Sequence, residues 1–541
     1  MDIPTPSALS ERHKTTHPTR RFALAGSSPQ DVREGLKAYF LETFDCYESL
    51  FTTLACDAAW FERPIPLRHP LIFYYGHTAT FFVNKLLLTR LIDTRIDAQM
   101  ESTFAVGVDE MSWDDLDENH YNWPTVAQVQ AYRDQVRAMV CEVIDTAPLT
   151  LPIDWNNPWW AIIMGVEHER IHLETSSVLI RQQRLDYVRE RDGWESCTRA
   201  GAAPENTLVE VPAGHTALGK AFSAPRYGWD NEYGRHEAEV GAFKTSRMLV
   251  SNGEFLEFMQ AGGYANDTWW DEEGRNWKAF AEATHPTFWV ADTNAPEPDW
   301  RLRLMTHEMP MPWNWPVEVN NLEARAFCRW KAEQTGHPVR LPSEDEWHRI
   351  LAHSGWQLPT NGPVDANLHL EHWKSACPVD HFRHGPFCDV VGNVWQWTAT
   401  PTYPFEGFET HPIYDDFTTP TFDAQHDIIK GGSWIACGNE AEPESRYAFR
   451  RHFFQHAGFR YVVAETDPVA PSSRYETDSS VSEYIEFHYG PEYFGVPNFP
   501  RALAELAIQA VGDGPHASAL DLRCATGPST FELAQHFDQV L

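Results

Sequence analysis

The chain has 541 residues, more than one hydrophobic core usually holds, so two or three domains are expected. Its 42 % apolar and 13 % aromatic residues are typical of folded domains and exclude a disordered chain. The 77 acidic and 43 basic residues give a formal net charge of −34, which argues against nucleic acid and anionic membranes as partners.

The start of the chain has no apolar stretch, and no run of about 18 apolar residues occurs, so neither a signal peptide nor a membrane span is expected. The nine cysteines form no Cys-x-x-Cys pair, which argues against a disulfide framework and against a cysteine zinc knot. A reducing, cytoplasmic location is therefore the expectation. The sequence leaves the oligomeric state open.

Residues 21–205 have the pattern of a helical bundle. Apolar residues recur at three- and four-residue spacing in four stretches, at 30–54, 69–92, 125–144 and 156–184. Pro70 is expected in the first turn of the second helix, and Asn157 and Pro158 are expected as cap and first residue of the fourth. Four such helices predict a four-helix bundle.

Residues 206–465 have short strand patterns and many glycines, prolines and tryptophans. The stretch 207–219 predicts strand, turn, strand. Helices are expected at 320–336, ending at a glycine cap, and at 343–355, starting with a capping box. The tryptophans, including the Trp-Gln-Trp at 395–397, are expected to be core residues.

A linker is expected at 466–481, where proline and serine gather, and a third segment at 482–541. Its sequence "ALDLRCATG", from Ala519 to Gly527, predicts an apolar strand that leads into a glycine turn and a helix, which is the opening of a nucleotide-type α/β domain. Too few residues follow the linker for a complete domain of that kind, so a partial one is expected.

Three histidines are the candidate metal ligands. His168 and His172 are four residues apart, so a helix places them on one face, where two imidazoles can bind one ion. A bare pair of this kind usually lies on a helix surface. Here the apolar "WWAIIM" precedes it, and His77 lies in a second apolar helix of the same bundle, so a three-histidine site is predicted.

The residue pattern leaves the metal open. Zinc would indicate a hydrolase or a thiol transferase, and non-haem iron would indicate O₂ chemistry. Glu167, Glu169 and Glu174 are near the pair in sequence, and Glu174 is the candidate to orient a ligand imidazole.

These motifs resemble those of a known family. "YYGHTATFF" at 74–82 with "EHERIHLE" at 167–174 resembles the iron site of the sulfoxide synthases of ergothioneine and ovothiol biosynthesis. The middle segment resembles their partner domain through "RLPSEDEWHRILAHSG", "VGNVWQWTAT", "GGSWIACGNEA" and "FRRHFFQHAGFR". The resemblance implies an α+β multidomain protein: a DinB-like four-helix bundle, a formylglycine-generating-enzyme-like domain (a C-type-lectin variant), and the start of a Rossmann-like methyltransferase domain.

Finer features resemble the ovothiol branch, the 5-histidylcysteine sulfoxide synthases. They are "LRHPLIFYYGHT", "FAVGVDEMSWDDLDE", "RYAFRRHFFQHAGFRY" and the methyltransferase-like third segment. The ergothioneine branch tends to have Gln where this chain has Ile171. The implied reaction is oxidative coupling of L-cysteine to L-histidine by Fe(II) and O₂. The alternatives are an ergothioneine-type enzyme acting on hercynine, a zinc-dependent thiol transferase or hydrolase, and a lectin-like module without catalysis.

The resemblance also implies roles for individual residues. His77, His168 and His172 would bind iron, and a tyrosine of the middle domain would lie over it. Tyr414 is the preferred candidate, and Tyr403 is the second, for which core packing is the expected fate. The candidates for clamping substrate carboxylates are Arg90, Arg95, Arg450, Arg451 and the adjacent His452.

Two departures from related families limit what the chain is expected to do. Asp521 and Gly527 are the candidate S-adenosylmethionine contacts, but Arg523 stands where a methyltransferase usually has Gly, so methylation is expected only from a complete domain. Formylglycine-generating enzymes need a copper-binding cysteine pair after their Gly-Gly-Ser motif. Here only Cys437 follows closely, so that family's own oxidation is not expected.

Overall fold

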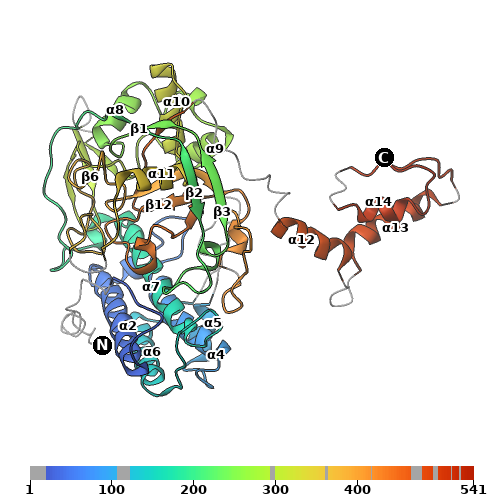
Figure 1. Cartoon of the computed structure of the whole chain (residues 1–541), viewed down its shortest axis with the longest axis horizontal. Helices are drawn as coiled ribbons and strands as arrows, with labels where there is room; N and C mark the ends of the chain where they lie inside the picture. The colour runs from blue at the N-terminus through green and yellow to red at the C-terminus, as the bar shows by residue number, and fades with distance from the viewer. Residues whose placement is uncertain are drawn as a thin grey trace. The chain divides into compact units, whose positions relative to one another are not determined.

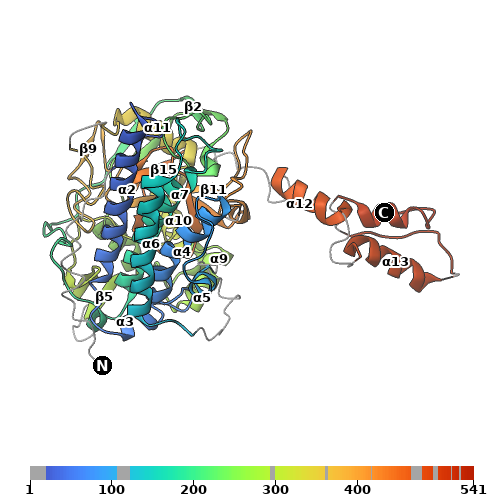
Figure 2. The same cartoon turned by 90° about the horizontal axis from the view of Figure 1, so that it is seen from below.

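The computed structural model describes residues 20–105, 122–292, 299–359, 363–415, 417–464, 478–490, 497–512, 514–522 and 526–541. Contacts divide the chain into two compact units, Met1–Thr421 with Gln425–Pro468, and Phe422–Ala424 with Val469–Leu541. The first unit holds the helical bundle and the strand-rich domain (Figures 1 and 2). None of the helices in the described ranges is long and apolar enough to cross a membrane.

The predicted four-helix bundle is confirmed. Its main helices are α2 (Pro29–Phe51), α4 (Leu71–Leu88), α6 (Val126–Thr146) and α7 (Trp160–Gln182). Helices α2 and α4 each contact both α6 and α7, so the four close around one core, and Figure 2 shows them side by side. The short elements α3 (Ala58–Phe61), α5 (Ala98–Thr103) and η1 (Leu185–Tyr187) connect or follow them.

Two helix starts differ from the prediction. Pro70 is the extended N-cap of α4 rather than a residue of its first turn. Helix α7 begins at Trp160 with Trp159 as N-cap, because Asn157 closes a separate turn by donating its N–H to the Asp154 carbonyl. The side chain of Asn157 accepts from the Trp159 N–H at 3.0 Å and its carbonyl accepts from the Trp160 N–H at 2.9 Å, so Asn157 caps the turn that leads into α7.

Helix α7 is buried on all sides. Every residue from Trp160 to Arg181 except Ile171 is buried, because α2 and α4 cover one side and the turn η5 (Gly438–Ala441) of the second domain contacts the helix as well. Its buried Glu169 and Arg181 are paired with opposite charges, as charges removed from water require. Arg181, for example, forms a 2.6 Å ion pair with Glu318 of the second domain.

Within the described ranges, the second domain contains five small sheets. Their strand orders are β1-β4-β15-β8, β13-β12-β11-β14, β5-β6-β7, β2-β3 and β10-β9. All pairings are antiparallel except that of β11 with β14. The strands are β1 (Leu208–Val211), β2 (Gly214–Leu218), β3 (His236–Val240), β4 (Phe243–Ser246), β5 (Trp289–Asp292), β6 (Asp299–Arg303), β7 (Glu308–Pro310), β8 (Val339–Arg340), β9 (Arg383–His384), β10 (Phe387–Cys388), β11 (Trp395–Pro401), β12 (His426–Lys430), β13 (Tyr447–Arg450), β14 (Ala457–Gly458) and β15 (Val462–Val463).

The predicted strands at 207–219 exist as β1 and β2, but they do not pair with each other. Leu208 faces Ser246 of β4, and Gly214 faces Val240 of β3. The two predicted helices are confirmed as α10 (Asn321–Thr335), which ends at a left-handed Gly336, and α11 (Glu344–Ser354), which has the expected capping box. The remaining helical elements are η2 (Asp230–Glu232), α8 (Asn252–Gln260), η3 (Asp267–Trp269), α9 (Glu272–Phe280) and η4 (Thr419–Thr421).

Tryptophan fills the core of the second domain, as predicted. Trp315, Trp347 and Trp397 are wholly buried, and Trp395 is 1 % exposed. The Trp397 indole donates to the Val319 carbonyl at 2.9 Å, so its single polar atom is satisfied inside the core.

The second unit contains α12 (Asp478–Tyr489), α13 (Phe499–Val511) and α14 (Pro528–Leu533). The predicted linker at 466–481 therefore overlaps the start of α12. The strand predicted before Gly527 is not a strand among the described residues. A single bridge joins Ala519 to Val540, and one bridge is too short a pairing to make a ladder. Gly527 is the left-handed N-cap of α14. Arg523 lies outside the described residues.

Candidate metal centre

Helices α4 and α7 bring the three predicted histidines together. His77 comes from α4, and His168 and His172 come from α7, with one donor nitrogen of each ring within 4.8 Å of the others. The ring centroids are 4.5 to 5.0 Å apart, and the Nε2 atoms of His168 and His172 are 3.2 Å apart. Within the described ranges this is the one group of three or more potential ligands that converges in this way.

The spacing fits a shared ion. Two imidazole nitrogens bound to one metal at ~2.0–2.1 Å lie about 3.0 Å apart at a right angle and about 3.4 Å apart at a tetrahedral angle. The observed 3.2 Å lies between these values. The His168 ring is also kept neutral, because burial, followed by the neighbouring His172 and His77, lowers the pKa of His168 well below its usual value. A neutral imidazole is the form that binds metal.

A backbone carbonyl orients the third ligand. Nδ1 of His77 lies 2.7 Å from the Phe104 oxygen, and a carbonyl only accepts, so Nδ1 carries the proton and Nε2 presents its lone pair to the site. Gly76 makes this approach possible, because a Cβ at that position would lie 2.6 Å from the Phe104 ring. Sequence analysis missed Phe104; the glycine next to His77 was the available signal.

The three glutamates near the pair bind elsewhere. Glu169 pairs with Arg133 of α6 at 2.9 Å, and Glu167 accepts the Asn439 N–H at 3.0 Å. Glu174, predicted to orient an imidazole, instead accepts from the Trp395 indole at 2.9 Å. The side chains that converge are therefore the three imidazoles, without a carboxylate among them.

Aromatic rings surround the histidines. Phe81, one turn after His77, stacks on His168 with centroids 3.7 Å apart and planes 10° apart. Phe73 stacks on His77 at 5.0 Å, and Tyr74 lies 5.9 Å from His172. These rings hold the imidazole planes and limit the access of water to them.

The second domain adds Tyr414 to this group. Its ring centroid is 6.1 Å from that of His168 and 5.0 Å from that of Phe81. Tyr403 lies in other surroundings, against His236 at 5.5 Å and with the Arg446 guanidinium 4.8 Å from its ring. Tyr403 thus packs against these two side chains, whereas Tyr414 borders the histidines.

The arginines predicted to bind substrate carboxylates differ in their exposure and in their ion pairs. Arg90 is exposed beyond the end of α4. Arg95 pairs with Glu101 at 2.7 Å, and Arg451 pairs with both Asp427 and Glu273 at 3.0 Å. These two guanidinium groups are held by carboxylates of the protein itself.

Three further basic residues belong to this description. Arg450 is on β13 opposite His426, and His452 is buried, with its ring 4.6 Å from that of Phe453. Sequence analysis missed Arg68. It is 3 % exposed, and its guanidinium lies 5.0 Å from the Phe453 ring and 6.0 Å from that of Tyr74, which borders His172.

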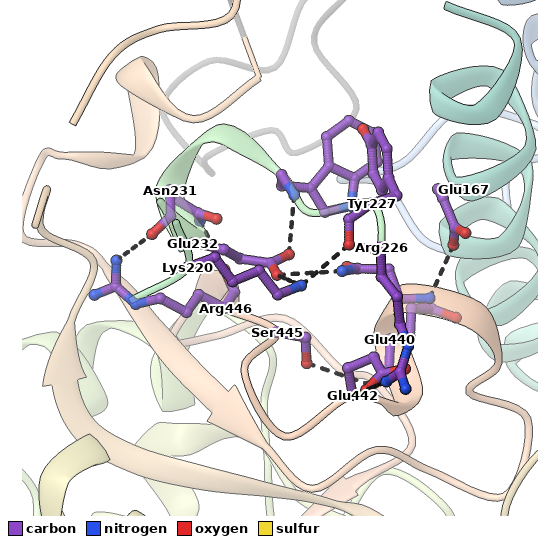
Figure 3. A network of polar contacts seen from close by, with 12 residues as sticks. Glu167, Lys220, Arg226, Tyr227, Asn231, Glu232, Glu440, Glu442, Ser445 and Arg446 are labelled. Carbon is purple, nitrogen blue, oxygen red and sulfur yellow. Dashed lines mark hydrogen bonds and ion pairs between the residues drawn. The ribbon is translucent and has the colours of Figure 1, made fainter. Parts of the chain in front are cut away.

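A buried polar network joins α7 to the second domain. Figure 3 shows Glu167 pointing from α7 toward the turn that carries Glu440, where it accepts the Asn439 N–H. Asn439 donates to Glu232 at 3.2 Å, and Lys220 donates to Glu232 and, at 3.1 Å, to the Tyr227 carbonyl (Figure 3). The residue before His168 is thus fixed by the second domain.

Comparisons with known proteins match both domains. The sulfatase-modifying factor enzyme 1-like domain matches residues 195–465, and the DinB superfamily matches residues 39–176. Hercynine oxygenases from Mycolicibacterium smegmatis and Mycolicibacterium thermoresistibile are 27 % and 28 % identical over 61 % and 73 % of this chain, and over 76 % and 87 % of their own length.

A eukaryotic relative, which is a longer protein, is also similar to most of this chain. Ergothioneine biosynthesis protein 1 of Schizosaccharomyces pombe is 24 % identical over 74 % of this chain and 51 % of its own length. The chain therefore belongs to the sulfatase-modifying factor enzyme 1-like family and, with a DinB-type bundle in front of that domain, has the organisation of the sulfoxide synthases of ergothioneine and ovothiol biosynthesis.

Proposed function

We propose that this chain is an iron(II)-dependent sulfoxide synthase that joins the sulfur of L-cysteine to imidazole C5 of L-histidine and oxidises that sulfur with O₂. The product is 5-histidylcysteine sulfoxide, the first intermediate of ovothiol A biosynthesis. The reaction balances, since a thiol, an imidazole C–H and O₂ give the coupled sulfoxide and one water. C–S bond formation provides two electrons and sulfur oxidation provides two.

One observation carries this proposal: three imidazoles from α4 and α7 converge beside a tyrosine supplied by the second domain. The DinB–sulfatase-modifying-factor arrangement and the names of the relatives, which are hercynine oxygenases, support oxidative chemistry on a histidine-like substrate. The sequence resemblance to the ovothiol branch supports histidine itself.

The protein residues divide the work between them. His77, His168 and His172 would hold the ion. A ferrous ion bound there supplies O₂ activation and ionises the cysteine thiol, whose free pKa is about 8.5. Bringing both substrates to one site is worth up to ~7–11 kcal/mol of proximity. Phe81 and Tyr74 would restrict water, and Tyr414, whose ring lies next to that of His168, would donate a proton during the reaction.

The test is turnover by anaerobically purified, iron-loaded protein given cysteine, O₂ and an equal mixture of histidine and hercynine. Mass spectrometry should show mainly the histidine-derived sulfoxide and one O₂ consumed per coupling. Preference for hercynine would instead make the chain an ergothioneine-type enzyme. Zinc-supported turnover without O₂ uptake would show a thiol transferase or hydrolase, and unchanged O₂ uptake in His168→Ala would contradict the assigned site.

Tyr414 is tested separately through the products. Tyr414→Phe should retain iron but divert cysteine toward its sulfinic acid, because the phenolic proton is lost while the ring remains. Tyr403→Phe is the matched control and should keep the wild-type product ratio. An unchanged ratio in Tyr414→Phe would remove Tyr414 from the mechanism.

A further inference from the structure

Lys85 of α4 contacts the loop of the second domain that carries Tyr414. His77, Phe81 and Lys85 are spaced by four residues on α4, so they share one helix face. The Lys85 ammonium donates to the Ile413 carbonyl at 2.7 Å and lies 4.1 Å from the centroid of the Tyr414 ring. It also lies 5.0 Å from the Phe81 ring.

The two contacts hold Tyr414 in complementary ways. The hydrogen bond fixes the backbone immediately before Tyr414, and the cation lies within the distance at which an ammonium is attracted to an aromatic face. Phe81 completes the arrangement, because its ring contacts both Tyr414 and His168. One helix face therefore carries a metal ligand, the ring that stacks on another ligand, and the group that holds the tyrosine.

The rest of the loop is fixed at its two ends. At one end, His411 donates from Nε2 to the Trp155 carbonyl of the bundle at 3.1 Å. At the other end, the Thr418 hydroxyl donates to Asp230. Pro412 and Asp415 between them are exposed, so this stretch lies at the surface. Lys85 holds the middle of the loop, where the phenol must be positioned.

We propose that Lys85 is a positioning residue that sets the product ratio: by holding Tyr414 beside the histidines, it favours C–S coupling over simple oxidation of cysteine to its sulfinic acid. The inference depends on the proposed function and on the role of Tyr414 in it. Under this inference the product ratio depends on how the two domains pack together, because the lysine belongs to the bundle and the tyrosine to the second domain.

The experiment compares Lys85→Met, Lys85→Arg and the control Lys37→Met. Methionine keeps the length of the side chain but removes the charge and the donors. Lys37 pairs with Asp145 on the same bundle, at the surface, so its loss should leave the product ratio unchanged. Lys85→Met should bind iron like wild type and raise the ratio of sulfinic acid to sulfoxide at least threefold, and Lys85→Arg should restore most of the wild-type ratio.

A double variant links the lysine to the tyrosine. If Lys85 acts through Tyr414, then Lys85→Met combined with Tyr414→Phe should give the product ratio of Tyr414→Phe alone. A ratio in Lys85→Met equal to wild type, or a double variant that shifts the ratio well beyond Tyr414→Phe, would overturn the inference.

Hydrogen exchange provides a readout independent of turnover. In Lys85→Met, backbone amides of residues 409–418 should exchange faster, while those of α2 and α6 stay protected. Unchanged exchange in the loop would overturn the inference even if the wild-type protein makes the sulfoxide. Conversely, faster exchange in a protein that makes no sulfoxide would contradict the proposed function and leave the Lys85 contact established.

Discussion

Substituting Gly438 with alanine tests how closely the second domain approaches helix α7. Gly438 has a φ of 64°, in the left-handed region. A Cβ there would lie 2.5 Å from Glu167 Oε2 and 2.8 Å from Tyr39 Oη, and closer still to Arg170 Nη1. These three groups are buried and interact with one another or with neighbouring side chains, so they cannot simply move into solvent.

Two costs add in this variant. Alanine in the left-handed region costs roughly 1–2 kcal/mol, and overpacking a close contact costs about 1–3 kcal/mol more. Gly336, the cap of α10, is the matched control, because its φ is 69° but a Cβ there would meet nothing within 4 Å. Gly336→Ala should therefore show the first cost alone, and the two variants should differ by about 1–3 kcal/mol in free energy of unfolding.

The assay is equilibrium urea denaturation of the full chain, followed by fluorescence of its 22 tryptophans and analysed from midpoints and slopes. Gly438→Ala should also bind iron more weakly, because Glu167 precedes His168 and is displaced by the new methyl group. Equal losses of stability in Gly438→Ala and Gly336→Ala would refute the inference that the close contact with α7 is energetically important.

Three other predictions follow from the site and its surroundings. Anaerobic Fe(II) at about 100 times its dissociation constant should stabilise wild type by ~2.7 kcal/mol in thermal unfolding, and His168→Ala should show no such shift. Arg133→Met should cost about 3–5 kcal/mol in denaturation, because it leaves the buried Glu48 and Glu169 without their cation, whereas Arg184→Met, from an exposed pair, should unfold like wild type. Burial lowers the pKa of His411 to about 4, below its value of about 6.5 in the unfolded chain. The neutral His411 ring therefore contributes to the free energy of unfolding above about pH 6.5, and this contribution is lost as pH falls toward 4. His411→Gln should thus become more stable relative to wild type as pH falls across that range. Burial raises the pKa of Asp230 to about 6, which gives stability the opposite pH dependence, but this effect is present in both proteins and cancels in the comparison. Parallel curves of unfolding free energy against pH for the two proteins would contradict the prediction.

The sequence determined the helical bundle and the histidine pair within it. Apolar spacing over 20 or more residues specifies a helix locally, and a helix fixes the relation between His168 and His172 whatever surrounds it. The capping box at Ser343 and the glycine cap at Gly336 were also local signals, and both are confirmed. The Trp-rich core was predictable because large apolar side chains have few alternatives to burial.

Only the tertiary structure decided which groups meet across the chain. Convergence of His77 with the pair, the hydrogen bond from His77 to the Phe104 carbonyl, and the placement of Tyr414 beside His168 depend on the packing of segments that are 27 to 246 residues apart, which no local pattern encodes. The same holds for Glu174. Its sequence position suggested an imidazole partner, but a helix buried on all sides presents each carboxylate to a different neighbour, and for Glu174 that neighbour is the Trp395 indole.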